Sequence, residues 1–535
     1  MTNNLTPSGD LVLEQLGINP HNLRADFPTR EQRLQYRAVV QWLTDYKPKS
    51  DAPNLERVKG YLEAFQHLCD VEEWERAKEI LFVSLNTPTQ QKLVHQMRTW
   101  AYYREQIKLY MIILGKLGGE IELEFLSGLG NAYYCLGEHQ TSISYHNQAL
   151  EITKDIGDLE KEGGIISNLG INYRSISKFK EAIECHQRSL EIAKITLDKE
   201  SEASSLNNLG TIYFSLGRYQ IAIDYYQKRL TINEQLENKM GKKNTLTNLG
   251  SIYNSLGEYK TAIDYFQQAL EIAKEINDRR GEERVLNNMA GTFHYLGQYQ
   301  ISIDYHQKAL EIAREIGDQE GEAAALSNLG NTYGIIGDLS MQIDYQRKAL
   351  EICINIGNRK AESQTLGALG TAYQKTEDFQ NSFACYQKQL VIARELNDRK
   401  TEGNALNNFG SLYYELSDYN SAIEYFEQRL KIAREIGDKR GEGNTLCNYG
   451  TALLKLQKYQ EALEYLQASL EICQKIGNLS TQAQNLKNLA ELHQLDNKTL
   501  ALEYCDRALS IATELGIPLA KECQELKEQL LSEQT

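Results

Sequence analysis

The stretch Leu326–Ile356, LSNLGNTYGIIGDLSMQIDYQRKALEICINI, decides the fold because its pattern recurs every forty residues along most of the chain. A fixed period of this size predicts a solenoid, in which each unit buries its apolar face only by stacking on its neighbours. One pair of positions shows that ten copies keep the register without an insertion: Leu129-Gly130, Leu169-Gly170, Leu209-Gly210, Leu249-Gly250, Met289-Ala290, Leu329-Gly330, Leu369-Gly370, Phe409-Gly410, Tyr449-Gly450 and Leu489-Ala490.

The first half of each copy has the period of a helix. In residues 203–216, Leu206, Leu209 and Tyr213 are spaced three and four residues apart, which places them on one helix face. Gly217 then interrupts the pattern, as a residue without Cβ does at a helix end. The first half is therefore predicted to be one helix that ends near Gly217.

The second half is also helical in period, from Tyr219 to Ile232. Small residues are expected to face each other between the two halves. Gly210 in the first helix and Ala222 in the second would let the two backbones approach closely. Each copy is thus predicted to be a helical hairpin.

The motif Leu209-Gly210-x-x-Tyr213, followed by Leu216-Gly217-x-Tyr219-x-x-Ala222, resembles the tetratricopeptide repeat (TPR) over residues 120–515. The resemblance implies an all-α fold, a right-handed α-solenoid of antiparallel helix pairs. Two features depart from the common repeat of about thirty-four residues: the period is forty, and no proline occurs from Thr89 through Ile517. The longer repeat is similar to that of Pins-type adaptors and of the TPR tails of bacterial signal-transduction ATPases.

Glycine and aspartate form the links between copies, as in Ile316-Gly317-Asp318-Gln319-Glu320-Gly321-Glu322. Gly317 suits the position just after a helix end, and Asp318 suits the N-cap of the next helix. The Asp318 carboxylate can accept hydrogen bonds from the free N–H groups of the following turn.

The sequence outside the regular array suggests four regions. Residues 1–50 form an irregular, partly helical N-terminal cap, and residues 51–118 form degenerate TPR-like hairpins; residues 119–516 hold ten units of forty-residue period, and residues 517–535 form a capping helix. Trp42, Trp74 and Trp100 all lie before the regular array. A cap is favoured for the first region because terminal repeats need an atypical cover, but a hinge or a docking segment would also fit.

Composition limits the possible partners and compartment. A formal net charge of −15 predicts no general attraction to nucleic acid or anionic lipid and leaves room only for a local basic patch. Nine scattered cysteines without a C-x-x-C pair indicate a reducing, cytoplasmic environment. No window approaches the ~20 apolar residues of a membrane span, so no membrane association is expected.

The sequence carries no catalytic, cofactor or metal motif. Met240-Gly241-Lys242-Lys243 lacks the upstream glycine and the hydroxyl of a phosphate-binding loop. The slot that holds His146, His186 and His306 in three copies holds Tyr226 or Phe266 in others. Because adjacent copies lie about 10 Å apart, these histidines are predicted to pack rather than to share a metal ion.

Polar residues occupy the opposite side of each first helix, which in TPR solenoids lines the concave groove. We call one slot of this side the Asn ladder: Asn168, Asn208, Asn248, Asn288, Asn328, Asn408, Asn448 and Asn488, interrupted only by Gly128 and Ala368. Asparagine has poor helix propensity and no apolar surface to bury. Its amide supplies donors and an acceptor, which suit an extended peptide backbone.

Neighbouring slots define the rest of the predicted groove. Next to the ladder lie Asn207, Asn287 and Asn407, with Ser or Thr in other copies, and Arg174, Arg284 and Tyr414 are expected at the groove surface. The Lys–Asn clamp that some TPR domains use for a terminal carboxylate would need Lys or Arg at slots held here by Ser and Asn. Such a clamp is therefore disfavoured, except for a local site near Lys487.

The ladder has two interpretations that the sequence leaves open. The amides could hold a peptide, or they could tie adjacent first helices together and so set the pitch of the solenoid. A tyrosine slot on the second helices (Tyr225, Tyr265, Tyr305, Tyr345, Tyr425 and Tyr465) could form an exposed stripe, but packing between the helices of a unit is favoured.

The function that these patterns favour is a non-enzymatic protein–protein interaction module. It would bind a peptide or helical segment of an unidentified protein in an Asn-rich groove, and a monomer is favoured. The alternative is a ligand- or peptide-sensing regulatory arm that acts with a separate signalling ATPase or effector. An enzyme ranks third, because fold alone does not exclude one.

Overall fold

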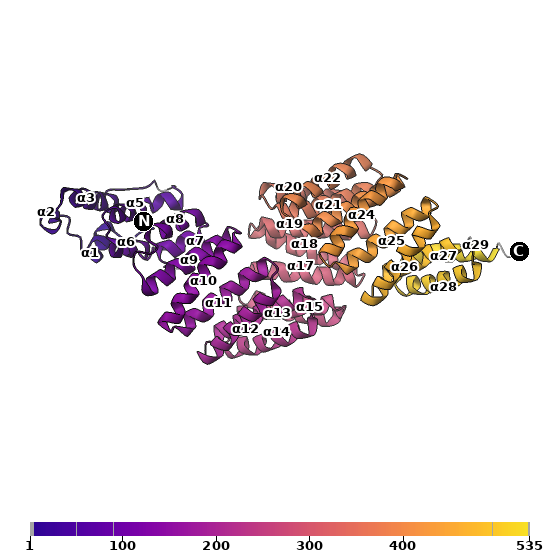
Figure 1. Ribbon diagram of the computed structural model, residues 1–535, viewed down its shortest axis with the longest axis horizontal. Helices are drawn as coiled ribbons and strands as arrows, with labels where there is room; N and C mark the ends of the chain where they lie inside the picture. The colour runs from indigo at the N-terminus through magenta and orange to yellow at the C-terminus, as the bar shows by residue number, and fades with distance from the viewer. Residues whose placement is uncertain (1–4, 50, 89, 495, 533–535) are drawn as a thin grey trace. The chain divides into compact units, whose positions relative to one another are not determined.

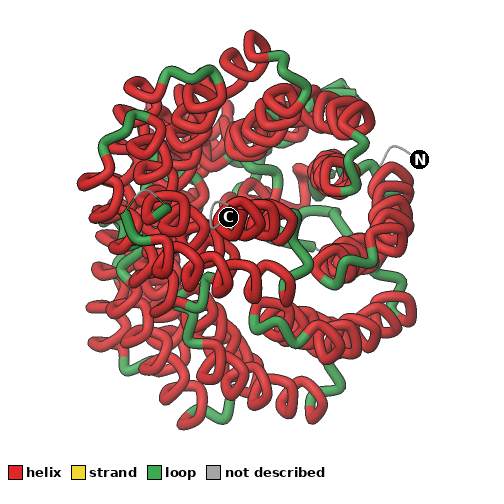
Figure 2. Tube along the Cα trace, turned by 90° about the vertical axis from the view of Figure 1, so that its right-hand side faces the viewer, coloured by secondary structure: helices red, strands yellow, loops and turns green. Residues whose placement is uncertain are grey.

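The computed structural model describes residues 5–49, 51–88, 90–494 and 496–532. Helices dominate these ranges, and the only extended pairing in them is an antiparallel bridge between Ser84 and Lys92 (Figures 1 and 2). None of the helices within them combines the length and apolarity needed to cross a membrane. The chain divides into two compact units, Met1–Ile252 and Tyr253–Thr535, and the boundary falls inside α15 (Lys239–Ser255).

The N-terminal unit begins with eight helices of irregular length: α1 (Gly9–Gln15), α2 (Leu23–Asp26), α3 (Arg30–Thr44), α4 (Asn54–Arg57), α5 (Lys59–Asp70), α6 (Trp74–Leu81), α7 (Leu93–Thr99) and α8 (Tyr103–Ile113). One cluster of buried hydrophobic side chains extends from Val12 of α1 to Leu129 of the first regular helix. The rings of Trp42, Trp74 and Trp100 pack against this core and are partly buried. The tryptophans of the irregular segment thus contribute to packing.

Regular helix pairs follow. In the N-terminal unit they are α9 (Gly119–Cys135) with α10 (His139–Ile156), α11 (Leu159–Ser175) with α12 (Phe179–Ile195), and α13 (Lys199–Ser215) with α14 (Tyr219–Gln235). The C-terminal unit continues with α16 (Tyr259–Glu275), α17 (Arg279–Tyr295), α18 (Tyr299–Glu315), α19 (Gln319–Ile335), α20 (Leu339–Asn355), α21 (Arg359–Lys375), α22 (Phe379–Glu395), α23 (Arg399–Glu415), α24 (Tyr419–Glu435), α25 (Lys439–Lys455), α26 (Tyr459–Ile476), α27 (Leu479–His493), α28 (Lys498–Glu514) and α29 (Leu519–Ser532). Within each unit, consecutive regular helices pack on each other, which confirms the predicted all-α solenoid of helix pairs.

The links end and restart the helices as the sequence predicts. Gly217 and Gly317 have φ values of 69° and 68°, in the left-handed region that favours glycine. One carboxylate oxygen of Asp318 accepts a hydrogen bond from the backbone N–H of Gly321 at 3.1 Å. This bond satisfies a free donor in the first turn of α19.

In five first helices, a glycine at the same position makes room for a ring from the second helix: Gly130, Gly170, Gly210, Gly370 and Gly410. A Cβ at Gly210 would lie 2.9 Å from Cζ of Tyr226, and one at Gly370 would lie 2.5 Å from Cε1 of Tyr386. The predicted close approach of small residues stands beside this ring contact, because in the equivalent pair of a later repeat a Cβ at Gly450 would lie 3.4 Å from the backbone oxygen of Ala462. The glycine allows a large ring to be buried between the helices.

The tyrosine slot of the second helices packs internally, as favoured from the sequence. Tyr225 stacks on Tyr213 of the same helix pair with a centroid distance of 5.5 Å and an interplanar angle of 9°. Equivalent stacks join Tyr253 with Tyr265, Phe293 with Tyr305, Tyr333 with Tyr345 and Tyr413 with Tyr425.

Histidines replace the ring in three repeats and are buried. His146 lies against Gly130 and His186 against Gly170, and both side chains are fully buried. Neither ring nitrogen of either residue has a hydrogen-bond partner among the described residues. Burial disfavours the charged imidazolium and lowers the pKa of each to about 4, and that of His306 to about 3. These are packing histidines, as predicted.

The glycine–ring contact predicts opposite effects for one substitution at two positions of the C-terminal unit. Gly370→Ala should lower the free energy of unfolding by about 1–3 kcal/mol, because its Cβ would overlap the Tyr386 ring. Gly291→Ala, also within a helix but with open space around the added Cβ, should raise it by about 0.5–1 kcal/mol. Urea unfolding followed by circular dichroism measures both; equal effects would contradict this account.

The buried histidines predict a loss of stability in mild acid. Their pKa is about 6.5 in the unfolded chain and about 4 in the folded chain, so below pH ~6.5 the unfolded state binds more protons. Stability should therefore fall as the pH drops from about 6.5 to about 4, by up to about 3 kcal/mol for each histidine. Thermal unfolding at several pH values measures this loss.

Phenylalanine is the natural replacement in the histidine test, because Phe266 and Phe426 hold the same slot. The variant His146→Phe/His186→Phe should have a shallower acid dependence than the unmodified chain. Tyr226→Phe, in the same slot and unit, is the control and should leave the slope unchanged. Identical slopes for all three proteins would show that these histidines titrate normally.

Candidate functional site

The Asn ladder lies on the side of each first helix that faces away from the paired second helix. In α13, Leu206 and Leu209 are buried, whereas Asn207 and Asn208 are half-buried. The same pattern recurs in the other first helices, except that Asn288 is exposed and Asn488 is buried. The amides thus line a polar surface without being shielded from solvent.

Four ladder residues are tied to the preceding repeat, and one of them, Asn488, donates to Oγ1 of Thr451 at 2.7 Å. The side-chain Nδ2 of Asn248 donates to Oδ1 of Asn207 at 3.4 Å. Asn328 donates in the same way to Asn287 at 3.1 Å, and Asn448 to Asn407 at 3.3 Å. Each bond joins two adjacent first helices, so these asparagines help to fix the spacing between repeats.

Two of the acceptors, Asn207 and Asn287, are themselves held by the second helix of their own repeat. Oδ1 of Asn207 also accepts from Nη1 of Arg229 at 2.9 Å, and Oδ1 of Asn287 is 2.6 Å from Nδ1 of His306. Asn207 and Asn287 therefore act as fixed acceptors between three helices.

The other four ladder residues have no such tie among the described residues; Asn288 is exposed, and the remaining three are half-buried. The side-chain amides of Asn168, Asn208 and Asn408 have no hydrogen-bond partner among the described residues. The reason lies one repeat earlier. The slot of Asn207 holds Ser127, Ser167 and Gly367 there, and none of these has a side-chain amide that could accept the hydrogen bond. These three half-buried amides are available to a ligand.

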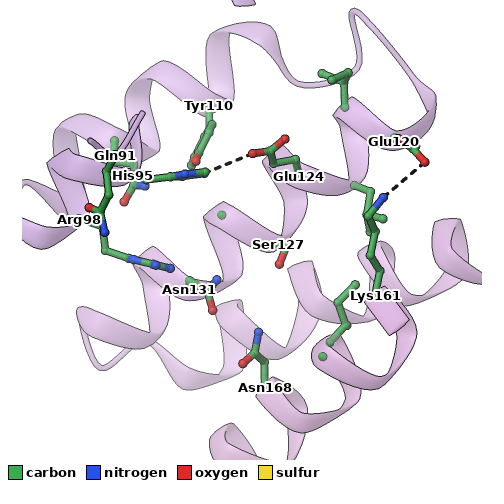
Figure 3. Close-up of a pocket in the computed structure, with 16 residues that line it drawn as sticks. Gln91, His95, Arg98, Tyr110, Glu120, Glu124, Ser127, Asn131, Lys161 and Asn168 are labelled. Atoms are coloured by element: carbon green, nitrogen blue, oxygen red, sulfur yellow. Dashed lines mark ion pairs between the residues drawn. The ribbon is translucent and has the colours of Figure 1, made fainter. Parts of the chain in front are cut away.

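A cavity of about 680 Å³ opens on this polar surface in the N-terminal unit (Figure 3). Ser127, Asn131 and Asn168 of the first helices line one side of it. The other side comes from α7, α8 and the segment just before α7, whose residues the sequence did not single out: Gln91, His95, Arg98, Gln106 and Tyr110. In Figure 3, the Arg98 side chain extends toward Asn131.

Most charges in this cavity are already paired. His95 Nε2 lies 3.3 Å from Glu124 Oε1, and Lys161 Nζ lies 3.4 Å from Glu120 Oε1. The hydrogen bond from His95 lowers the pKa of Glu124 despite its partial burial. Arg98 is exposed and forms no ion pair with any described residue.

Tyr110 explains why the ladder is interrupted at Gly128. A Cβ at Gly128 would lie 2.7 Å from the Tyr110 hydroxyl oxygen. This hydroxyl and Oε1 of Gln106 are both buried without a hydrogen-bond partner among the described residues. Burial raises the pKa of Tyr110, so the hydroxyl remains protonated at neutral pH.

A second cavity, of about 740 Å³, lies in the C-terminal unit along α21, α23 and α25. Asn407 and Asn408 line it, together with Gln389 and Arg429 from the second helices. Gln389 and Arg429 occupy a slot that holds Ala269, Ala309 or Ala349 elsewhere. A long polar residue at an alanine slot was the sequence signal that could have revealed this cavity.

The remaining predicted groove residues differ in their surroundings. Arg174 is half-buried without an ion pair among the described residues, and Arg284 is exposed. Tyr414 packs edge-on against Tyr419 with a centroid distance of 5.4 Å, and burial raises its pKa. The local carboxylate site expected near Lys487 is not available, because Lys487 Nζ lies 3.0 Å from both Glu491 and Glu522.

Within the described ranges, no three His, Cys, Asp or Glu side chains gather in a way that could hold a metal ion. The helix pairs and the polar face of the first helices define an all-α repeat protein. The model of the family described as tetratricopeptide repeat matches residues 122–195, 196–275, 281–355, 361–435 and 441–514. These segments make up more than half of the sequence, and the chain belongs to the tetratricopeptide repeat family.

No curated protein matches the sequence. Among solved structures, the chain is similar to a Rap protein complexed with Competence and Sporulation Factor (20% identity, 66% of this chain and 99% of that chain, TM-score 0.45). It is also similar to the apo form of the quorum sensor NprR from B. thuringiensis (17%, 64% and 99%, TM-score 0.46). A third is a signal transduction ATPase with a tetratricopeptide repeat sensor from Pyrococcus horikoshii (14%, 86% and 71%, TM-score 0.46).

The two kinds of ladder residue predict different effects of one substitution within the C-terminal unit. Asn328→Ala should lower the free energy of unfolding by about 0.5–1.5 kcal/mol, because it removes the bond to Asn287. Asn408→Ala should leave it unchanged or raise it by a few tenths of a kcal/mol, since alanine is the better helix former. Chemical unfolding of both variants tests this; an equal loss would show that Asn408 is also structural.

Proposed function

We propose that the chain is a non-enzymatic interaction module that binds an extended segment of a partner protein along the polar face of its first helices. The observation that carries this proposal is the set of half-buried, unpartnered amides of Asn168, Asn208 and Asn408. Asparagine in the middle of a helix lowers helix stability, and an unpartnered asparagine forms no hydrogen bond that would offset this loss. A ligand that accepts and donates hydrogen bonds would supply the missing partners of these amides.

Peptide backbone is the ligand chemistry that suits these amides best. Each side-chain amide can donate to a carbonyl and accept from an N–H group of the same extended chain. Two cavities, one of about 680 Å³ beside Asn168 and one of about 740 Å³ beside Asn408, have room for the side chains of such a segment. Each hydrogen bond contributes only about 0.5–1.5 kcal/mol, so binding depends on several together.

The proposal also covers the compartment and the oligomeric state of this module. All nine cysteines are free, and seven of them are buried, which suits a reducing compartment such as the cytoplasm. The aromatic rings of the tyrosine slot stack on rings of their own helix pair, so they do not need a second copy of the chain to cover them. We therefore propose a monomer that acts on another protein.

A selection from a library of random peptides tests the proposal, because it finds ligands of the groove whether or not the natural partner has been identified. We expect enriched peptides that bind with micromolar dissociation constants. Asn168→Ala/Asn208→Ala should weaken peptides bound to the N-terminal unit by about tenfold, and Asn408→Ala should weaken those bound to the C-terminal unit. Fluorescence anisotropy with synthetic peptides measures these changes.

The matched control changes the tied asparagines, Asn248, Asn328 and Asn448, to alanine. This variant should lose stability, whereas the variants of Asn168, Asn208 and Asn408 should keep the thermal unfolding midpoint of the unmodified chain. The proposal fails if no peptide is enriched, or if enriched peptides bind equally well to the variants of the unpartnered asparagines.

A further inference from the structure

We propose that the cavity of the C-terminal unit recognises the acidic side chains of its partner segment. This inference rests on the proposed function and specifies the chemistry of the ligand. Although the whole chain carries a net charge of −15, four cations line this cavity: Lys360, Lys400, Arg429 and Arg440. Only two carboxylates, those of Asp398 and Asp438, accompany them.

Three of these cations form a row with the period of the repeat. Lys360, Lys400 and Arg440 are the second residues of α21, α23 and α25, and all three are exposed. A cation in the first turn of a helix is unfavourable, because it lies at the positive end of the macrodipole. A row of such cations beside three helix N-termini creates a positive potential without an evident structural purpose.

An earlier repeat shows how a cation in this slot is normally neutralised. Arg280, the equivalent residue of α17, pairs through Nε with Oδ2 of Asp318 in the next repeat at 2.6 Å. The other oxygen of Asp318 accepts from the N–H of Gly321 and caps α19. One carboxylate thus serves both the helix and the preceding cation.

The carboxylate that would neutralise Lys360 is used by its own helix. Oδ1 of Asp398 accepts from the backbone N–H of Thr401 at 3.0 Å. Oδ2 accepts from the Thr401 hydroxyl at 2.8 Å, a contact that Gly321 cannot make in the earlier repeat. Lys360 has no ion pair within 4.0 Å among the described residues.

The carboxylate opposite Lys400 is taken by a buried arginine. Nη2 of Arg429 lies 2.6 Å from Oδ2 of Asp438, and the Arg429 residue is only 3% exposed. Gly403 and Gly441 leave room for its guanidinium, because a Cβ at either position would collide with it. Nη1 of Arg429 has no hydrogen-bond partner among the described residues.

The repeat after Arg440 has no carboxylate to offer. Asn478 occupies the slot of Asp318 and Asp438, and its amide donates to Oδ1 of Asn444 at 2.9 Å. These three consecutive cations therefore have no ion pair within 4.0 Å among the described residues, although the charges of Lys360 and Lys400 still help to lower the pKa of Asp398 and Asp438. The cavity keeps an excess of two positive charges beside the unpartnered amide of Asn408.

The spacing of the row suits carboxylates along an extended peptide. Packed neighbouring helices lie about 8–10 Å apart, and three residues of an extended chain span about 10 Å. A segment with Glu or Asp at about every third residue could therefore place one carboxylate near each cation. Asn404, Asn407 and Asn408 lie beside the row and can hydrogen-bond the backbone between these side chains.

The test uses the full chain and two labelled peptides of about ten residues, one with Glu at every third position and one with Gln there. The Glu peptide should bind at least about tenfold more tightly at low salt, and the difference should shrink as salt rises to about 0.5 M. Lys360→Gln/Lys400→Gln/Arg440→Gln should weaken the Glu peptide by at least about tenfold. Fluorescence anisotropy measures every arm.

A matched control removes the same charge elsewhere in the unit. Lys308, Lys348 and Lys388 are exposed on second helices outside the cavity, and their change to Gln should alter the affinity by less than about twofold. Equal weakening by both triple variants, or equal binding of the Glu and Gln peptides, would overturn the inference. Inorganic pyrophosphate that binds in the cavity when the Glu peptide does not would also overturn it, in favour of a phosphate ligand.

The library selection separates this inference from the proposed function. If enriched peptides depend on Asn408 but lack acidic residues and ignore the three cations, the groove binds peptides and the acidic specificity is wrong. If no peptide is enriched and the Glu peptide does not bind, both fail.

Discussion

The contact between a first-helix glycine and a ring from the second helix is the constraint on which the other features depend. Gly210 faces Tyr226 and Gly370 faces Tyr386, and an added Cβ would overlap either ring. Where this contact occurs, it fixes the rotation of the first helix about its axis, and Gln346 and Leu466 fill the same space beside Gly330 and Gly450. Once Gly210 and Leu209 face the second helix, Asn208 must point away from it, because successive helix residues differ by about 100°. The polar face is thus a consequence of the packed face.

The direction of a side chain on this face does not by itself determine its role. Asn248 and Asn208 occupy the same slot, yet Asn248 donates to Asn207 whereas Asn208 has only Ser167 before it. The role therefore depends on the residue one repeat earlier. A repeat protein can alternate structural and available amides in this way without changing its backbone.

The forty-residue period was enough to predict the helix pairs, the glycine turns and the aspartate caps, because each depends on residues close in sequence. The contact of Gly210 with the Tyr226 ring was missed, since Ala222 and Tyr226 both lie on the facing side of α14 and the spacing does not show which side chain comes nearest. Arg98 and Tyr110 were missed because α7 and α8 do not follow the repeat register. The sequence predicted a ligand-binding role and a helix-tying role for the ladder only as alternatives. Assigning one role to each asparagine requires the distances between neighbouring helices.

Arg429 shows how one substitution in a packing slot can change the electrostatics of a distant surface. Burying a guanidinium is costly unless it is paired, and here the pairing uses the carboxylate of Asp438. Asp438 caps its helix through Gly441 and pairs with Arg429, so neither of its oxygens remains for Lys400. In the repeat of Ala309 no such arginine exists, and Asp318 pairs with Arg280 instead. The positive charge of the cavity is therefore determined inside the helix packing, at a slot where most copies carry a small side chain.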